Sequence, residues 1–158
     1  QMDAAECVRH YKSLTNVERA FRSLKTVDLK VRPIHHRTDD RVRTHIFLCV
    51  LSYYVEWHMR EAWRALMFAD SEQEAKATRD PVAPATRSKA AQAKVASRTL
   101  DDRTPVHSFS TLLASLTTIV RNICRTPHAG PEAPTFAVVT TANAQQQRAL
   151  DLLREIQM

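Results

Sequence analysis

An almost unbroken apolar run at residues 46–55 is the feature that most restricts how this chain can fold. Apart from Ser52 and two tyrosine hydroxyls, every side chain in the run is apolar. A helix needs about 20 such residues to cross a bilayer, so this run is too short for a membrane span. It predicts instead the buried centre of a long helix, from about Asp40 to Ala69, inside a protein core.

A second amphipathic helix is predicted over residues 11–25. Its apolar side chains recur at spacings of three and four, the pattern that buries one face of a helix. They are Val17, Ala20, Phe21 and Leu24. Thr15, followed three residues later by Glu18, fits a capping box. This box predicts that the helix starts near Asn16 and that Tyr11 lies ahead of it.

The polar side of the same helix carries one carboxylate among cations. Tyr11, Glu18 and Lys25 follow each other at seven-residue intervals. A straight α-helix drifts only about 20° over seven residues, so the three are predicted to form one line. Arg22 lies one turn beyond Glu18. The simplest interpretation of that pair is an i, i+4 salt bridge on a solvated face, worth about 0.2–0.5 kcal/mol.

The pattern changes after Lys25, where apolar and charged residues alternate as far as Pro33. Residues 27–31 are therefore predicted to form a short extended segment or edge strand. His35 and His36 follow in a predicted loop. We interpret them as loop or phosphate-contacting side chains and not as metal ligands, because neighbouring side chains on an extended backbone point apart.

Composition limits the classes of function. The chain has 158 residues, of which 44% are hydrophobic and 25% charged, as is typical of a soluble protein with one core and an appendage. Its single glycine, Gly130, excludes the glycine-rich phosphate loops of P-loop and Rossmann proteins. Cys7, Cys49 and Cys124 lack zinc-finger spacing, which predicts reduced thiols in a cytosolic protein.

Positive charge is concentrated in one segment. The whole chain carries a net charge of +6, and residues 9–43 alone hold ten Lys or Arg against four carboxylates, which is also +6. Such a segment is expected on a surface that meets phosphate groups. A basic stretch by itself is more often a solvated face, so the charge favours nucleic acid only modestly.

Three domains are predicted, at residues 1–69, 70–107 and 108–158. In the middle segment Leu100 is the only large apolar residue besides valines, and prolines interrupt the run. This composition predicts a flexible linker with one transient helix near residues 89–98.

The last predicted domain is a helical tail. Ser108 is expected to cap an amphipathic helix whose apolar face extends to Ile123. A strand is predicted at residues 136–140 and a closing helix at residues 144–156.

Residues 11–25 resemble the signature of the DDE transposases of bacterial insertion sequences. The subgroup concerned is marked by Tyr, two residues, Arg, three residues, Glu, six residues, Lys. Tyr11, Glu18 and Lys25 fall on that spacing, and Leu14 stands at the Arg position. The similarity to the C-terminal part of such transposases covers residues 9–68 and continues, with weaker motifs, through the rest of the chain.

The resemblance implies that Glu18 is catalytic, as the third carboxylate, after two aspartates, that holds Mg²⁺ or Mn²⁺. Lys25 would hold a phosphate of the transposon end, and Tyr11 would contact DNA nearby. Arg22 is a further candidate for a phosphate contact because it lies beside Glu18. The expected partner is double-stranded DNA at the terminal inverted repeats, in the bacterial cytoplasm at the nucleoid. A homodimer is left open, and no nucleotide or membrane partner is expected.

In the family, both aspartates precede the Glu, on strands of an RNase H-like sheet. Asp28, Asp39 and Asp40 all follow Glu18, so none of them fits. The expected fold is mainly α with one or two short strands, the C-terminal portion of an RNase H-like domain whose sheet is largely missing. We expect a fragment that is inactive alone, with metal bound only in the intact protein. The alternatives are a non-catalytic basic helical module that binds DNA, and a helix pair for protein interactions.

Overall fold

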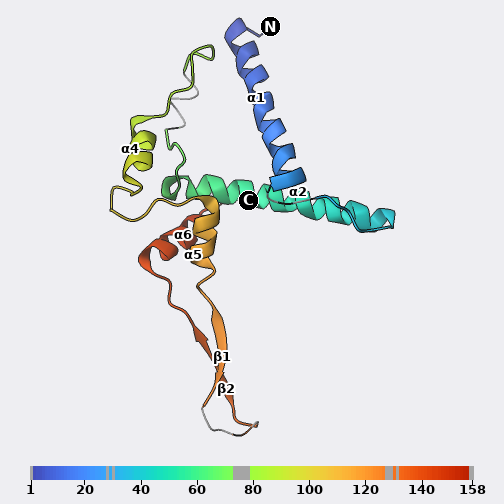
Figure 1. Ribbon diagram of the computed structural model, residues 1–158, viewed down its shortest axis with the longest axis vertical. Coiled ribbons are helices and arrows are strands. Elements are labelled where there is room, and N and C mark those ends of the chain that lie inside the picture. The colour runs from blue at the N-terminus through green and yellow to red at the C-terminus, as the bar shows by residue number, and fades with distance from the viewer. Residues whose placement is uncertain are drawn as a thin grey trace. The chain divides into compact units, whose positions relative to one another are not determined.

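The computed structural model describes residues 2–27, 29, 31–72, 79–126, 130 and 132–156. The chain is mainly helical with one two-stranded antiparallel sheet (Figure 1), which confirms the expected mainly α class. It divides into two compact units. Unit 1 comprises Gln1–Glu61 with Glu72–Ser88, and unit 2 comprises Ala62–Ser71 with Lys89–Met158. Among the residues described, none of the helices combines the length and the apolar character that a membrane span needs.

Helix α1 (Ala4–Arg22) opens unit 1 and begins well before the predicted start near Asn16. Asp3 is its N-cap. The Asp3 carboxylate accepts a hydrogen bond of 2.7 Å from the Glu6 amide, and the Glu6 carboxylate accepts one of 3.1 Å from the Asp3 amide. This capping box provides hydrogen-bond acceptors for backbone amides at the start of α1, and it lies upstream of the capping box predicted at Thr15. The predicted start was therefore wrong, and Tyr11 lies inside the helix.

A π-helical turn, η1 (Ser23–Val27), continues α1. Beyond it, the amides of Leu29 and Val31 donate hydrogen bonds of 3.2 and 3.0 Å to carbonyls of η1. These bonds fold the backbone onto the helical turn, so the described residues of 27–31 do not form the predicted extended segment. Positions 28 and 30 of that segment lie outside the described residues.

Helix α2 (Asp39–Ala62) confirms the long helix predicted from about Asp40, although it ends earlier, at the 3-10 helix η2 (Trp63–Leu66). The apolar run is not the buried centre that was predicted, because no residue of α2 is buried and Phe47 is 63% exposed. A helix that is apolar on all sides needs neighbours on all sides. In the part of unit 1 that the structure describes, α1 with η1 is the other helical element, and it is too little to enclose α2.

The hydrophobic core lies in unit 2. Trp63, Leu66 and Leu112 are its largest fully buried side chains. The indole N–H of Trp63 donates a hydrogen bond of 2.9 Å to the carbonyl of Ala149, and its ring centroid lies 5.7 Å from that of Phe109. The other buried apolar residues are Met67, Ala91, Val106 and Ala149. The core is thus built around Trp63, which lies within the segment predicted to form the long helix.

Among the described residues of unit 2, three further helices and a hairpin follow η2. They are α4 (Lys89–Ser97), α5 (Phe109–Leu116), β1 (Arg121–Arg125), β2 (Thr135–Val139) and α6 (Ala144–Arg154). Ser108 caps α5 as predicted, because its hydroxyl accepts a hydrogen bond of 3.1 Å from the Thr111 amide. The strand predicted at residues 136–140 and the helix predicted at residues 144–156 are confirmed by β2 and α6.

Helix α5 ends at Leu116, with Thr117 as its C-cap, and is therefore shorter than the helix predicted to extend to Ile123. The hydroxyls of Thr117 and Thr118 donate hydrogen bonds of 2.7 and 2.8 Å to the carbonyls of Ala114 and Ser115 in the last turn. The β-branched residues that follow favour a strand. Ile123, which was predicted to lie on the apolar helix face, belongs to β1.

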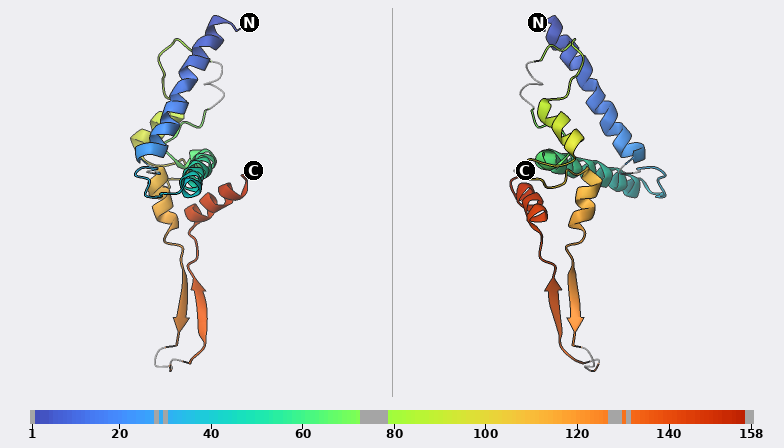
Figure 2. Two further views of the ribbon diagram at one scale, coloured as in Figure 1. Left: turned by 90° about the vertical axis from the view of Figure 1, so that its right-hand side faces the viewer. Right: turned by 60° about the vertical axis from the view of Figure 1, so that its left-hand side comes forward.

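Strands β1 and β2 form an antiparallel hairpin whose register centres on the pair of Ile123 and Ala137. Within unit 2, the hairpin extends from the ends of α5 and α6 (Figure 2). Every residue of the two strands is exposed except Cys124, which is half-buried. The hairpin therefore adds little to the core.

Residues 89–107, predicted to belong to the linker, contribute to unit 2. Ala91 and Val106 are buried in its core. The Lys94 ammonium donates hydrogen bonds to the carbonyl of Ala69 (3.3 Å) and to the hydroxyl of Ser71 (3.0 Å). The boundaries of the two units thus differ from the predicted domain limits, and the flexibility of the linker stays a prediction.

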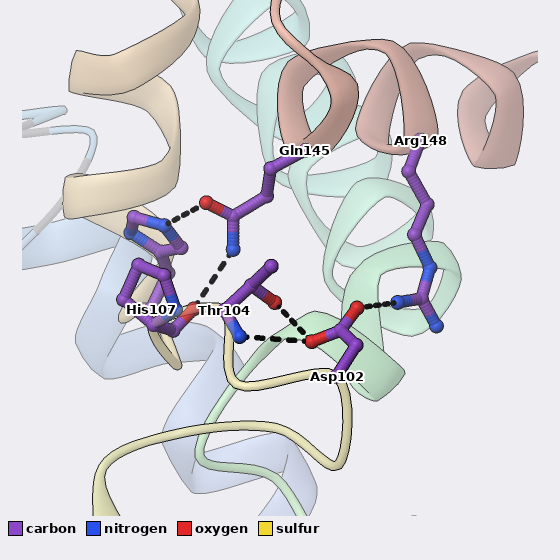
Figure 3. Close-up of polar contacts among 6 residues, drawn as sticks. Asp102, Thr104, His107, Gln145 and Arg148 are labelled. Atoms are coloured by element: carbon purple, nitrogen blue, oxygen red, sulfur yellow. Dashed lines mark hydrogen bonds and ion pairs between the residues drawn. The ribbon is translucent and has the colours of Figure 1, made fainter.

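A polar cluster joins the turn after α4 to helix α6 (Figure 3). The Asp102 carboxylate accepts hydrogen bonds from the amide and the hydroxyl of Thr104, at 2.9 and 2.6 Å, and from the Arg148 guanidinium, at 3.2 Å. The side-chain oxygen of Gln145 lies 3.2 Å from Nε2 of His107. These contacts hold the turn against the first two turns of α6.

The Thr104 hydroxyl, then its amide, and then the Arg148 charge hold the pKa of Asp102 below its ordinary value of 3.8. A lowered folded pKa means that the carboxylate stabilises unit 2 above pH 3.8, and that this contribution is lost as pH falls through the folded pKa. We expect Asp102→Asn to make the urea midpoint of unit 2 less dependent on pH below about 4. Equal acid sensitivity in the variant and the parent protein would contradict this.

Candidate DNA-binding and catalytic residues on helix α1

The predicted site residues lie on one continuous helical piece of unit 1. Tyr11, Glu18 and Arg22 belong to α1, and Lys25 belongs to η1. Tyr11 is 75% exposed, and the side chains of Glu18 and Arg22 are 71% and 69% exposed. All of these groups are therefore accessible to a large ligand.

Glu18 and Arg22 form the predicted i, i+4 ion pair. Nη2 of Arg22 donates to Oε1 of Glu18 at 3.2 Å. Because both side chains are mostly in water, the pair is weak and an incoming phosphate or cation can replace either partner. A carboxylate beside a guanidinium on an open surface is thus available for binding without a large cost in stability.

Lys25 departs from the line that the sequence predicted. Tyr11 and Glu18 share one line because the helix between them is α-helical, but the chain enters the π-helix η1 before Lys25. The i→i+5 bonds of a π-helix widen the turn, so seven residues no longer return to the same line. Instead the Lys25 ammonium lies 5.8 Å from the ring centroid of Phe21, at a distance suited to a cation–π contact.

The predicted apolar stripe of α1 is exposed. Val17 and Phe21 are 53% and 56% exposed, and α1 has no buried residue. Leu14, at the signature position where the family has Arg, is 59% exposed and lies one turn before Val17, on the same stripe. The prediction that this stripe packs in a core was wrong for the described residues, because α1 has too few neighbours in unit 1 to cover it.

In the described part of the chain, Glu18 does not belong to a group of side chains that could hold a metal ion. Among the described residues, no group of three His, Cys, Asp or Glu side chains is placed to hold a metal. Asp3, the one aspartate that precedes Glu18, caps the start of α1. Glu18 lies fifteen positions after Asp3, which corresponds to about 22 Å along the helix axis. The described residues therefore do not make a complete site for Mg²⁺, which takes about six oxygen ligands.

The histidines after η1 serve the local structure. Nε2 of His45, on α2, lies 3.1 Å from the carbonyl of Val31 and 3.9 Å from the Cys49 sulfur. Its ring meets that of His36 edge to face at 5.5 Å. These contacts tie the loop before α2 to the helix. The sequence signal for this cluster is the i, i+4 spacing of His45 and Cys49.

A groove that no sequence pattern predicted lies between α1 and α2 inside unit 1. Its volume is about 330 Å³. The residues that line it are Arg19, Ser23, Tyr53, Glu56, Trp57, Arg60 and Glu61. Glu56 and Arg60 are one turn apart on α2 and form an i, i+4 ion pair at 2.6 Å. The groove thus brings two arginines and two glutamates together with the rings of Tyr53 and Trp57.

Comparisons with known proteins assign no family. The chain matches no protein-family model, no curated protein and no solved structure. The assignment of function therefore depends on the residues of α1 and their surroundings.

Proposed function

We propose that this chain is the part of an insertion-sequence DDE transposase that carries the third carboxylate, and that it binds DNA through the basic segment around α1. The observation that carries the proposal is the signature Tyr11, Glu18 and Lys25 on one exposed helical piece, within the segment that holds a net charge of +6. The finer fold, an RNase H-like domain whose sheet these helices would cover, belongs to the same proposal.

Three features of the described residues support binding to DNA. Arg22 is exposed and pairs with Glu18 on the surface, and Arg19 and two aromatic rings line the groove between α1 and α2. The segment that holds these arginines carries the net charge of +6. Phosphate contacts position a protein on the duplex without reading its sequence. The chain on its own should therefore bind duplex DNA with strong salt dependence and weak sequence preference.

The exposed apolar run of α2 supports the fold part of the proposal. Ile46, Phe47, Leu48, Val50 and Leu51 are all more than 40% exposed. A helix with apolar side chains on every face is found in the interior of larger proteins. Such a helix is expected where a sheet and further helices complete the domain.

Glu18 would contribute one oxygen ligand to a metal site whose aspartates precede it in the intact protein. Because the described residues do not hold a metal by themselves, no catalytic step is assigned to this chain. It is expected to bind DNA without cutting it.

The second candidate is a non-catalytic helical module that binds DNA. Its support is the Glu18–Arg22 pair, which is an ordinary surface contact and needs no catalytic role. In this case Glu18 only neutralises part of the basic surface. Replacing Glu18 separates the two candidates, because only a transposase needs its carboxylate for cleavage.

The DNA-binding part of both candidates is tested with a double variant, Arg22→Gln with Lys25→Gln. If each cation neutralises one phosphate, the slope of log binding constant against log salt falls by about 0.9 per contact, or about 1.8 for both. Fluorescence anisotropy with a duplex of mixed sequence, titrated at several salt concentrations, measures this slope.

The matched control is Lys89→Gln with Arg154→Gln, which removes the same two charges from exposed positions in unit 2. We expect the control to leave the slope close to that of the parent chain. Equal slopes in both double variants would mean that α1 does not contact phosphates. If the parent chain shows no salt-sensitive binding to DNA, the result would favour the remaining alternative, a helix pair for protein interactions.

A further inference from the structure

The outer edge of strand β2 is unprotected. Its sequence, Thr-Phe-Ala-Val-Val, contains no charge, and all five residues are exposed. Within the described residues the sheet contains β1 and β2 only, so the backbone groups on the outer edge of β2 have no strand partner. Proteins usually protect such an edge with charges, prolines or bulges.

The other edge of the hairpin is protected. β1 carries Arg121 and Arg125 at its two ends, and both are exposed. The charged edge of β1 is therefore protected against pairing with another strand, whereas the uncharged edge of β2 is free to pair. A two-stranded hairpin alone is at best marginally stable in water, so an added strand on β2 would stabilise it.

We propose that β2 is a homodimerisation edge, at which a second copy of this chain adds its own β2 in antiparallel orientation. The β2 sequence is complementary to itself about Ala137. With Ala137 on the two-fold axis, Phe136 of one copy lies opposite Val138 of the other. The symmetry gives two such pairs in the dimer. Pairs of an aromatic and a β-branched residue are favourable across antiparallel strands.

Charge decides against the other ways of joining two hairpins. If two β1 strands paired about Ile123, Arg121 of each copy would lie opposite Arg125 of the other, and like charges directly opposite each other destabilise a sheet. Pairing β1 of one copy with β2 of the next is not a two-fold contact and would continue into an open filament. Of the two closed four-stranded sheets, the β2 pair is the one that avoids opposed arginines, because the arginines of β1 then lie at its outer edges.

The faces of the hairpin fit the same arrangement. Cross-strand pairs share a face, so Cys124 with Phe136 and Asn122 with Val138 make one face without charge. Phe136 and Val138 are 53% and 47% exposed. The dimer doubles this apolar face and places its four large side chains next to each other across the seam. The inference is independent of the proposed function in DNA transposition.

Sedimentation equilibrium of the full chain tests the proposal, with a mass of twice 18.0 kDa as the expected result. Ala137→Lys places two ammonium groups opposite each other at the axis, and like charges in an interface are strongly unfavourable. We expect it to weaken dimerisation by about a hundredfold or more. Ile123→Lys is the matched control, because Ile123 is the cross-strand partner of Ala137 on the same face and is 63% exposed. It should leave the dimer intact.

Mixing Ala137→Lys with Ala137→Glu completes the test, because opposite charges at the axis should restore a mixed dimer. Far-UV circular dichroism of each variant reports whether unit 2 remains folded. A monomeric parent chain, larger assemblies in place of a dimer, or equal loss of the dimer in Ala137→Lys and Ile123→Lys without rescue by mixing would overturn the proposal.

Discussion

Replacing Trp63 with alanine is expected to destabilise unit 2 by about 3–5 kcal/mol, the range for removing a large aromatic side chain from a core. Trp63 is fully buried and packs near Phe109. The change also removes the indole N–H that satisfies the carbonyl of Ala149, which is costly in a buried position. Because a small unit is only marginally stable, the variant should lose most of its folded population.

Hydrogen exchange of the amides in α5 and α6 measures this effect, since their protection reports the opening of unit 2. The control is the other tryptophan of the chain, Trp57, which is 48% exposed in unit 1. Trp57→Ala should change the stability of unit 2 by no more than about 0.5 kcal/mol. Equal loss of protection in both variants would show that Trp63 is not the centre of an independent core.

Replacing Glu18 with glutamine is expected to abolish DNA cleavage by a protein that carries this chain together with the two upstream aspartates. Loss of a group that only supports a metal ligand costs about 10–100-fold, so the loss of a ligand itself should exceed about 100-fold. The fold should be retained, because the change removes only an exposed ion pair worth about 0.2–0.5 kcal/mol. A magnesium-dependent cleavage assay on a transposon-end duplex measures the activity.

Glu155→Gln is the control for this experiment, since it removes the same charge from an exposed position after α6. We expect full cleavage in the control, and unchanged or slightly stronger DNA binding in the Glu18 variant, because a negative charge has left the surface that is proposed to bind phosphates. Cleavage that survives Glu18→Gln would support the non-catalytic module. Cleavage by the isolated chain would contradict the proposal that its metal site is incomplete.

Local signals predicted local structure well. Ser108 caps α5, residues 136–140 and 144–156 are close to β2 and α6, and Glu18 pairs with Arg22. Each of these features depends on residues within four positions of one another. The start of α1 could have been predicted in the same way, because Asp3 and Glu6 have the spacing of a capping box.

The predicted end of α5 and the predicted position of Lys25 were wrong for two different physical reasons. The turn after Leu116 depends on hydrogen bonds from two threonine hydroxyls, which compete with continuation of the helix and are not visible in an apolar periodicity. The π-helix η1 moves Lys25 off the line of Tyr11 and Glu18, and a seven-residue spacing cannot reveal a change in the number of residues per turn.

The sequence by itself determined that the chain is mainly helical, that Ser108 caps α5, and that the surplus of positive charge accompanies Glu18. Only the tertiary structure decided which apolar residues are buried. Trp63, Leu66 and Leu112 are enclosed because elements distant in sequence meet around them, whereas the more apolar run of α2 remains exposed. The physical reason is that periodicity states which face of a helix is apolar, but burial requires another element to cover that face.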